Sequence, residues 1–387
     1  MILSFKTTVI FSAFFALFAP EVSLADVTRA QLGEMLFFDT ELSRDRSQAC
    51  ASCHDPDTGF VDANGPRDGW ASSIGDDGSS RGARNAPTAA YAAFSPRFHQ
   101  RADGAWVGGQ FLDGRAADLA EQAGGPFLNP VEMAMPDKAA VVQRLQENPD
   151  YVSAFMALFG ADVFDDSDRA YLALTQALSA FEQTSVFAPF DSKYDRYLRG
   201  EVQLTQQEDL GRVLFFSQQF TNCNICHKLR DSEVDLAETF SNYEFHNIGV
   251  PANLTLEAEL GAAVNDQGLL DNPAVDDPAQ VGKFKVPSLR NVAVTGPYMH
   301  NGVFQDLRTV VLFYNKYNAR SDKRQINPET DQEWRPPEVP GTLSMKELET
   351  GPALDDMRID ALVAFLRTLT DARYGPLLQE LDAAKAE

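Results

Sequence analysis

Apolar residues recur at helical spacing in four stretches of the chain, and these stretches form two similar pairs. The segment LGEMLFF at 32–38 resembles LGRVLFF at 210–216, and each precedes a motif that contains two cysteines. Each half of the chain also closes with an amphipathic segment, at 171–181 and at 359–369. The spacing predicts a helix for each stretch, and the repeated order indicates two copies of one small helical unit.

Long stretches between these helices are rich in Gly, Pro and Asp and carry few strand signals. Residues 62–87 and 249–281 are clear examples. We therefore expect a mostly α fold with extensive loops. The polar segment at 191–200 predicts a domain boundary near residue 200, with an N-terminal domain over 26–200 and a C-terminal domain over 201–387.

The first 25 residues have the pattern of a secretory signal peptide. Lys6 supplies a positive charge, residues 9–19 are apolar, and Ser23-Leu24-Ala25 fits a cleavage site before Asp26. A retained N-terminal anchor is the alternative, although the apolar run is short for a membrane span. We expect residues 1–25 to be removed on export.

The chain of 387 residues has a formal net charge of −23 at pH 7. Such an acidic chain is a poor candidate for binding nucleic acid or an anionic membrane surface. The net charge therefore argues against nucleic acid and anionic membranes as partners. It says little about the chemistry that the chain performs.

The four cysteines of the chain all lie in two pentapeptides, Cys50-Ala51-Ser52-Cys53-His54 and Cys223-Asn224-Ile225-Cys226-His227. Each has the C-x-x-C-H form of a c-type haem attachment site. Thiols one helical turn apart can form thioethers with both haem vinyl groups, and the adjoining His then faces the iron. A structural zinc site or a redox-active C-x-x-C is the alternative. Together with the signal peptide, the motifs predict a periplasmic protein that carries two covalent haem c groups.

Several motifs outside the cysteine pentapeptides resemble those of the bacterial di-haem cytochrome c peroxidase family. The similarity extends from about residue 32 to residue 378. Within the family, the chain is most similar to the branch that serves methylamine utilisation. The resemblance implies two cytochrome c-like domains, each with one covalent haem. The motifs are RNAPT at 84–88, DGR at 113–115, NPVEMAMP at 129–136, the segment 189–196, FKVPSLRN at 284–291, GPYMHNG at 296–302 and LFYNKY at 312–317.

Two iron-ligand positions distinguish that branch from ordinary peroxidases of the family, beyond the proximal ligands His54 and His227. The loop at 73–83, where those peroxidases carry a distal His, contains no His or Met. The first haem is therefore expected to be open, with His99 as an alternative sixth ligand. Tyr314 aligns with the Met that those peroxidases use at the second haem. The resemblance thus implies a His/Tyr iron, whose hard phenolate donor favours oxidised iron; otherwise Tyr314 is a core aromatic residue.

The resemblance also implies catalytic residues beside the first haem. Glu132 matches the distal carboxylate of the family, which moves a proton between the two oxygens of peroxide. Its apolar neighbours predict a raised pKa, whereas an ordinary exposed Glu is the alternative. Gln122 and Pro126 match residues that shape the same pocket.

A calcium ion between the two haems is a further expectation from the resemblance. Its protein ligands match the side chain of Asn85 and the carbonyl oxygens of Thr295 and Pro297. Hard oxygen donors of this kind suit calcium.

The chain departs from the family pattern at two aromatic positions. Leu112 stands where the family usually has a Trp between the haems, and the segment QQFTN at 218–222 lacks the Trp of the methylamine-utilisation branch. Trp106 lies six residues before Leu112 and is a candidate replacement. These departures imply either that the long-range radical step of the family is missing or that it follows a different route, through Tyr or Phe-rich packing.

By this resemblance, the chain is an enzyme that uses hydrogen peroxide, or oxygen plus electrons, to oxidise a protein partner. The expected partner is the methylamine dehydrogenase precursor, in which two tryptophans become tryptophan tryptophylquinone. The alternative is a peroxidase that reduces hydrogen peroxide to water with electrons from a small cytochrome or cupredoxin. A pure electron-carrier cytochrome is a third alternative, and it requires both irons to be ligated on both faces.

Overall fold

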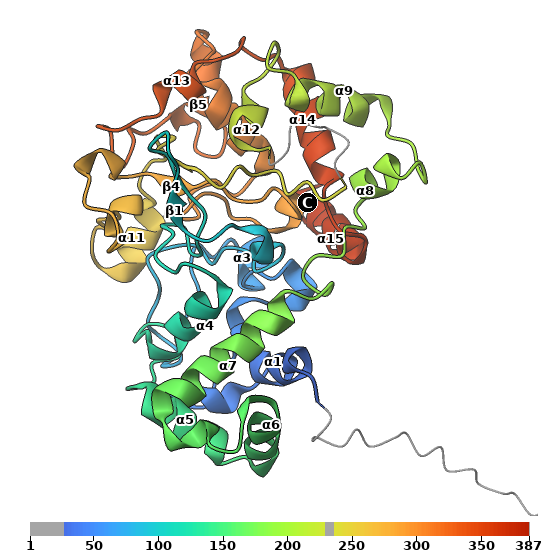
Figure 1. Cartoon of the computed structure of the whole chain (residues 1–387). Helices are drawn as coiled ribbons and strands as arrows, with labels where there is room; N and C mark the ends of the chain where they lie inside the picture. The colour runs from blue at the N-terminus through green and yellow to red at the C-terminus, as the bar shows by residue number, and fades with distance from the viewer. Residues whose placement is uncertain (1–26, 229–235, 387) are drawn as a thin grey trace, which may run out of the picture.

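The computed structural model describes residues 27–228 and 236–386. The predicted signal peptide at 1–25 lies outside the described residues. The described part is mostly helical, with long loops and short two-stranded sheets (Figure 1), so the expected fold class is confirmed at this level. None of its helices is both long and apolar enough to cross a membrane.

The helices follow the predicted order along the chain. Those of the first half are α1 (Arg29–Phe37), α2 (Cys50–Cys53), α3 (Asn64–Asp68), α4 (Leu119–Leu128), α5 (Lys138–Gln146), α6 (Pro149–Phe159) and α7 (Ser167–Glu182). Those of the second half are α8 (Lys193–Leu198), α9 (Gln206–Phe216), α10 (Cys223–Cys226), α11 (Leu254–Leu260), α12 (Leu307–Asn315), α13 (Met345–Leu348), α14 (Asp356–Arg367) and α15 (Gly375–Ala386).

Strands are few and short. The described ranges contain three antiparallel pairs: β1 (His99–Gln100) with β2 (Trp106–Val107), β3 (Phe245–His246) with β4 (Phe284–Lys285), and β5 (Ile326–Asn327) with β6 (Gln332–Glu333). Short 3-10 helices occupy several loops: η2 (Thr40–Leu42), η3 (Pro56–Thr58), η4 (Ala92–Phe94), η5 (Val163–Asp165), η6 (Leu269–Asp271), η7 (Pro278–Gln280), η8 (Val292–Val294), η9 (Asp322–Gln325) and η10 (Ala372–Tyr374).

The two predicted helix pairs form two equivalent packing units. Helix α1 packs on α7 in the first half, and α9 packs on α14 in the second. The glycine of each repeated segment lies at the crossing point. A Cβ on Gly33 would lie 2.0 Å from the carbonyl oxygen of Ala177, and one on Gly211 would lie 1.9 Å from that of Ala361. Only glycine permits this approach, which explains why the LGxxLFF pattern recurs.

The same two helices also begin in the same way. Thr28 and Thr205 each cap the helix that follows, and each forms a capping box, with Gln31 and Glu208 respectively. Reciprocal capping satisfies backbone N–H groups that have no partner within the helix. The duplication is therefore present in the local sequence signals as well as in the packing.

Two large apolar clusters hold the molecule together. The buried members of the first run from Val27 to Phe187, and those of the second from Tyr194 to Leu369. In Figure 1 the first half, coloured blue to green, lies below the second half, coloured yellow to red. Tyr194 belongs to the second cluster although it precedes residue 200. The division into domains at that residue stays a prediction.

Candidate functional site

Both motif histidines are oriented in the same way. The Nδ1 atom of His54 lies 3.1 Å from the carbonyl oxygen of Phe60, and that of His227 lies 3.2 Å from that of Phe240. A carbonyl oxygen only accepts, so each Nδ1 carries the proton and each Nε2 keeps a free lone pair. Burial lowers the pKa of both rings, that of His227 to about 4. Both side chains are therefore neutral and ready to ligate a metal.

The loop backbones that accept these protons are equivalent as well. Phe60 and Phe240 both have a φ of 58°, in the left-handed region. Such a conformation is costly for a bulky residue and persists only where the surroundings impose it. In each half it aims a carbonyl oxygen at the motif histidine.

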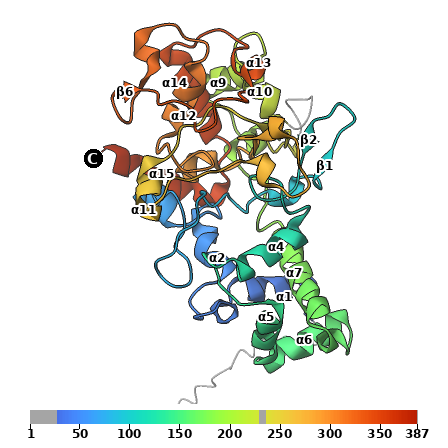
Figure 2. The same cartoon turned by 90° about the vertical axis from the view of Figure 1, so that its left-hand side faces the viewer.

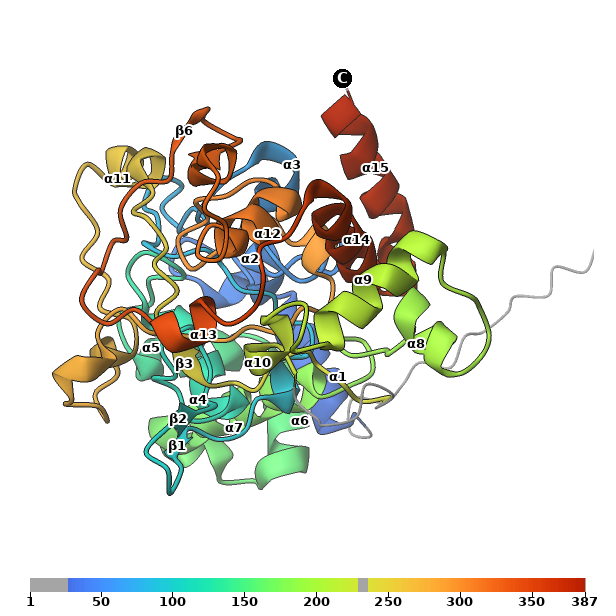
Figure 3. The same cartoon turned by 90° about the horizontal axis from the view of Figure 1, so that it is seen from above.

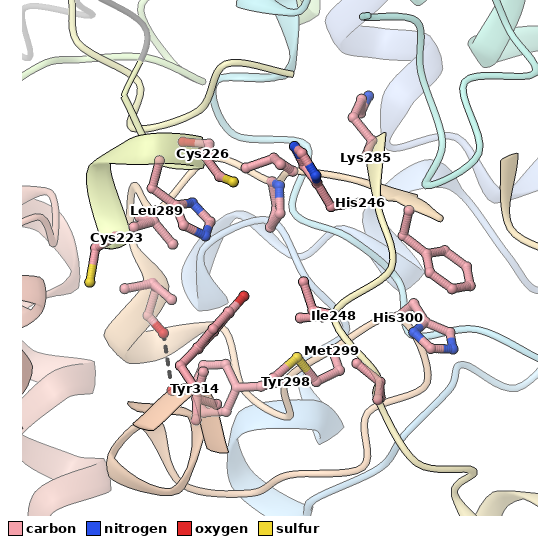
Figure 4. Close-up of a pocket in the computed structure, with 18 of the residues that line it drawn as sticks. Cys223, Cys226, His246, Ile248, Lys285, Leu289, Tyr298, Met299, His300 and Tyr314 are labelled. Carbon is pink, nitrogen blue, oxygen red and sulfur yellow. Dashed lines mark hydrogen bonds between the residues drawn. The ribbon is translucent and has the colours of Figure 1, made fainter. Parts of the chain in front are cut away.

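A cavity of about 360 Å³ lies beside the second motif (Figure 4). Its wall includes Cys223, Cys226 and His227 on one side and Tyr314 of α12 on the other. The phenol of Tyr314 points into this cavity in Figure 4. Burial, together with the nearby thiols, raises the pKa of Tyr314. A phenolate at this position therefore needs a bound cation to stabilise it, as a ferric iron does.

The cysteines favour haem attachment over the alternatives. All four are free thiols, and in Figure 4 the sulfur atoms of Cys223 and Cys226 point in different directions. Within residues 27–228 and 236–386, no group of three or more His, Cys, Asp or Glu side chains converges on a point that could hold a metal ion. Zinc needs such convergence. Two separated thiols beside a cavity fit a covalent macrocycle instead.

Glu132 lies next to the first motif. Burial and, more weakly, the charges of Asp62 and Glu132 raise the pKa of the Cys53 thiol to about 11. Burial also raises the pKa of Glu132 itself, and Arg115 and a hydrogen bond from Asn129 offset the effect in part. The Asn129 Nδ2 donates to Glu132 Oε1 at 2.8 Å. Glu132 is therefore a desolvated carboxyl held in one orientation.

Helix α4 brings Gln122 and Pro126 to the same region. They lie one helical turn apart, so they share a face of α4. The carbonyl oxygen of Pro126 accepts a hydrogen bond from the Met133 N–H at 3.2 Å. This contact ties the segment that carries Glu132 to the end of α4.

The loop at 73–83 lies over Glu132 and offers no iron ligand. The Asp76 N–H donates to the Glu132 carbonyl oxygen at 2.8 Å, and Asp76 in turn accepts from Ser43 and Ser47. His99, the alternative ligand, lies exposed on β1 with its Nδ1 2.8 Å from the Arg97 carbonyl oxygen. The structure therefore does not support His99 as a ligand.

The duplication also shows which residue of the first half corresponds to Tyr314. Helices α4 and α12 both begin after a capping Asp, Asp118 and Asp306. Pro126 lies seven residues after the first residue of α4, and Tyr314 lies seven residues after the first residue of α12. The equivalent position therefore holds a phenol in one half and a side chain without a donor atom in the other.

The three predicted calcium ligands share one cavity wall. Asn85, Thr295 and Pro297 all line the cavity that contains Tyr314. The amide nitrogen of Asn85 donates to the Ala71 carbonyl oxygen at 3.2 Å, so its amide oxygen, the atom suited to calcium, faces away from that bond.

Three charged or polar residues near the site had no role in the sequence-based prediction. Lys285 lines the cavity and donates from Nζ to the Gly109 carbonyl oxygen, and burial lowers its pKa to about 7. Arg115 faces Glu132, and His246 lines the cavity 3.5 Å from Glu244. Lys285 and Arg115 lie inside the family motifs at 284–291 and 113–115, so the resemblance could have indicated that they belong to the site. No sequence pattern around His246 indicated that it belongs to the site.

Leu112 and Trp106, the two residues discussed above for electron transfer between the haems, lie in different surroundings. Leu112 lines the cavity, and its carbonyl oxygen accepts from the Lys285 N–H at 2.8 Å. Trp106 stacks on Phe98, with ring centroids 4.9 Å apart, in a small cluster with Phe245. That cluster lies outside the set of residues that line the cavity.

Known proteins match nearly the whole chain. The family model for di-haem cytochrome c peroxidase matches residues 27–203. The methylamine utilization protein MauG of Paracoccus denitrificans is 55% identical over 371 residues, which cover 95% of each chain. The cytochrome c551 peroxidase of Pseudomonas aeruginosa is 33% identical over 303 residues, which cover 77% of this chain and 74% of that one.

A solved structure shares both the sequence pattern and the fold. The diheme peroxidase BthA of Burkholderia thailandensis is 36% identical, with a TM-score of 0.79 that covers 90% of this chain and 87% of that one. These similarities extend beyond the haem motifs to the whole arrangement of helices and loops. The chain is therefore a di-haem oxidoreductase that belongs to the di-haem cytochrome c peroxidase family, within which it is similar to MauG.

Proposed function

We propose that the mature protein oxidises a protein partner with hydrogen peroxide, or with oxygen plus electrons, in the periplasm. The proposed partner is the methylamine dehydrogenase precursor, in which the enzyme completes tryptophan tryptophylquinone. The 55% identity to a methylamine utilization protein supports this choice of partner. The predicted signal peptide at 1–25 and the two C-x-x-C-H motifs support the compartment.

The residues present fit two haem c groups, one in each of two proposed domains, 26–200 and 201–387. Cys50 and Cys53 would attach the first haem, with His54 as its proximal ligand. Two buried histidines with free Nε2 atoms and a cavity beside the second motif support this assignment. When bound, the haems supply the redox chemistry that removes electrons from the partner.

The second site would be closed by its own ligands. Cys223 and Cys226 would attach the haem, and His227 and Tyr314 would ligate its iron. A hard phenolate stabilises iron in its oxidised states. A calcium ion held by Asn85, Thr295 and Pro297 is part of the same proposal.

Glu132 would act on peroxide at the first site. Its carboxylate takes a proton from the bound oxidant and returns it to the oxygen that leaves as water. Burial raises the pKa of Glu132, which brings this exchange closer to neutral pH. Gln122 and Pro126 would bound the space in which peroxide is held.

One observation carries the proposal: the equivalent helix position holds Tyr314 in one half and Pro126 in the other. A phenol can ligate iron, whereas a proline ring cannot. Tyr314 would therefore block the second iron to small molecules, whereas Pro126 would leave the first accessible to peroxide.

Electron paramagnetic resonance of the ferric holoprotein tests this asymmetry. The expected spectrum has one high-spin and one low-spin haem signal, and both signals should vanish after peroxide is added without an organic radical in their place. A six-coordinate first haem, or a second haem ligated by Met or His, would show the proposal to be wrong.

Steady-state assays separate the proposal from the peroxidase alternative. The protein should oxidise the methylamine dehydrogenase precursor and turn over peroxide only slowly with reduced small cytochromes or cupredoxins. Fast turnover with those donors and no reaction with the precursor would favour simple reduction of peroxide to water.

A further inference from the structure

An aromatic cluster connects Tyr314 to a tryptophan near the surface. The ring of Phe313 lies 6.1 Å from that of Tyr314 and 5.6 Å from that of Trp334, measured between centroids. Phe304 packs on both Phe313 and Trp334, at 5.1 and 5.7 Å. Tyr314 and Trp334 thus contact the same buried ring, Phe313. The Lys316 Nζ lies over this ring, 3.9 Å from its centroid.

Trp334 lies at the edge of the molecule. It follows β6 directly, and both residues of β6 are exposed. Figures 2 and 3 show β6 at the periphery, so a partner can approach this element. Trp334 itself is half-buried, and its ring packs on Phe313 and Phe304.

The other two tryptophans of the chain do not connect to Tyr314. Trp106 stacks on Phe98 in a separate cluster, and Trp70 lies under the guanidinium of Arg81. Trp334 is therefore the readily oxidised indole that shares a contact with the proposed ligand of the second iron.

The chemistry of the neighbouring tyrosine favours Trp334 as the exit. A phenol loses an electron easily only if its proton leaves too. The Tyr317 hydroxyl donates to the carbonyl oxygen of Ile248 at 2.9 Å, which is too weak a base to take the proton, and burial raises its pKa to about 12. An indole can be oxidised with its proton retained, and Trp334 Nε1–H stays bonded to the Arg324 carbonyl oxygen at 2.9 Å.

We propose that Trp334 is the relay through which electrons enter from the protein partner. This inference rests on the proposed function. One electron leaves the indole of Trp334, passes Phe313 and Tyr314, and reaches the second haem site; the partner then reduces the indole again. Two such transfers, with two protons, convert one hydrogen peroxide into two waters. Trp334 thereby supplies a route that Leu112 and the segment at 218–222 cannot.

Peroxide treatment of the holoprotein without any partner tests the relay. Over repeated additions of peroxide with no partner to reduce it, the indole of Trp334 should slowly accumulate oxygenated products, which peptide mass spectrometry locates, although no organic radical builds up directly after a single addition. Trp334→Phe keeps an aromatic ring against Phe313 and should lose this modification. It should also return to the resting haem spectrum severalfold more slowly, because an internal electron donor has been removed.

Trp106→Phe is the matched control, since it alters a half-buried, stacked indole outside the cluster. Oxidation confined to Trp334, and unchanged in the control, supports the relay. If the haem spectrum responds to peroxide but Trp334 stays unmodified, or Trp106 is modified equally, the relay is wrong and the proposed function stands. If the haem spectrum does not respond, both proposals are wrong. Thermal unfolding of each variant identifies a general loss of structure.

Discussion

Single side chains at equivalent positions make the two haem sites different. Both motif histidines donate to a backbone carbonyl oxygen, and both have a free Nε2. The difference lies on the opposite side, where Pro126 and Tyr314 occupy matching places in their helices. Glu132 adds a desolvated acid beside the first motif only. Under the proposed function, these three residues explain why catalysis would occur at one iron and why oxidising equivalents would be stored at the other.

Replacement of Glu132 tests its role as the proton carrier. Glu132→Gln should slow the reaction with hydrogen peroxide about 10²–10⁴-fold, because an amide cannot accept the proton. The carboxylate is the active form, so the wild-type rate should rise as pH increases through the raised pKa, and the variant should lose that rise. Stopped-flow absorbance of the haems measures both. Glu34→Gln, on the exposed face of α1, should leave rate and pH profile unchanged.

The equivalence of Pro126 and Tyr314 makes a second prediction. Pro126→Met places a thioether where α12 places its phenol, so the first haem should become six-coordinate and low-spin, and its reaction with peroxide should be largely lost. Electron paramagnetic resonance reports the spin state. Pro126→Leu has a similar volume without a donor atom and should stay high-spin. A high-spin first haem in both variants would contradict the equivalence.

Each half is organised around one close helix crossing. Gly33 and Gly211 bring α1 and α9 into backbone contact with α7 and α14, and Phe37 and Phe215 pack into the two cores. The cysteine motif is the next α-helix after each crossing helix, α2 after α1 and α10 after α9. Helix packing therefore determines where the thiols of each motif lie.

Substitution at the crossing should destabilise its half. Gly211→Ala puts a methyl group 1.9 Å from the Ala361 carbonyl oxygen, so α9 and α14 must separate, at a cost of about 1–3 kcal/mol in the free energy of unfolding. Gly341→Ala is the control, because no atom lies within 4 Å of the added carbon. Denaturant unfolding followed by circular dichroism compares the two. Equal midpoints would show that the crossing tolerates a side chain.

Buried ion pairs connect the halves of the molecule. Arg84 pairs with Asp113 of the first half at 2.5 Å and with Asp266 of the second at 2.6 Å. Both carboxylate side chains are nearly inaccessible, 2% and 4% exposed. Tyr91 adds a hydrogen bond to Asp371 at 2.7 Å across the same boundary. These contacts connect the half that carries the first motif to the half that carries the second.

Loss of the central cation should be costly. Arg84→Met leaves buried Asp266 without its cation and leaves buried Asp113 with only the more exposed Arg115, so the free energy of unfolding should fall by about 3–5 kcal/mol. Arg169→Met removes a solvent-exposed pair with Asp162 and should cost about 0–1 kcal/mol. Urea unfolding of both holoproteins measures the difference. Similar losses for the two variants would mean that the buried cluster contributes little.

Features that depend on neighbours in the sequence were predictable. The segment at 171–181 lies within α7, and that at 359–369 overlaps α14, which ends at Arg367. Helical periodicity and the spacing of thiols are local properties, so they are readable without the fold. The motifs also led to the family, which the similarity to known di-haem proteins confirmed.

The tertiary structure decided what depends on distant residues. Three features depend on segments far apart along the chain. Glu132 is desolvated, Phe313 contacts both Tyr314 and Trp334, and Arg84 pairs with two buried acids. Burial and ring contacts arise only when those segments pack together, so no local sequence pattern predicts them. The amino-acid sequence by itself determined two equivalent C-x-x-C-H motifs, because their spacing is local; packing determined how the surroundings of the two motifs differ, because those surroundings come from distant segments.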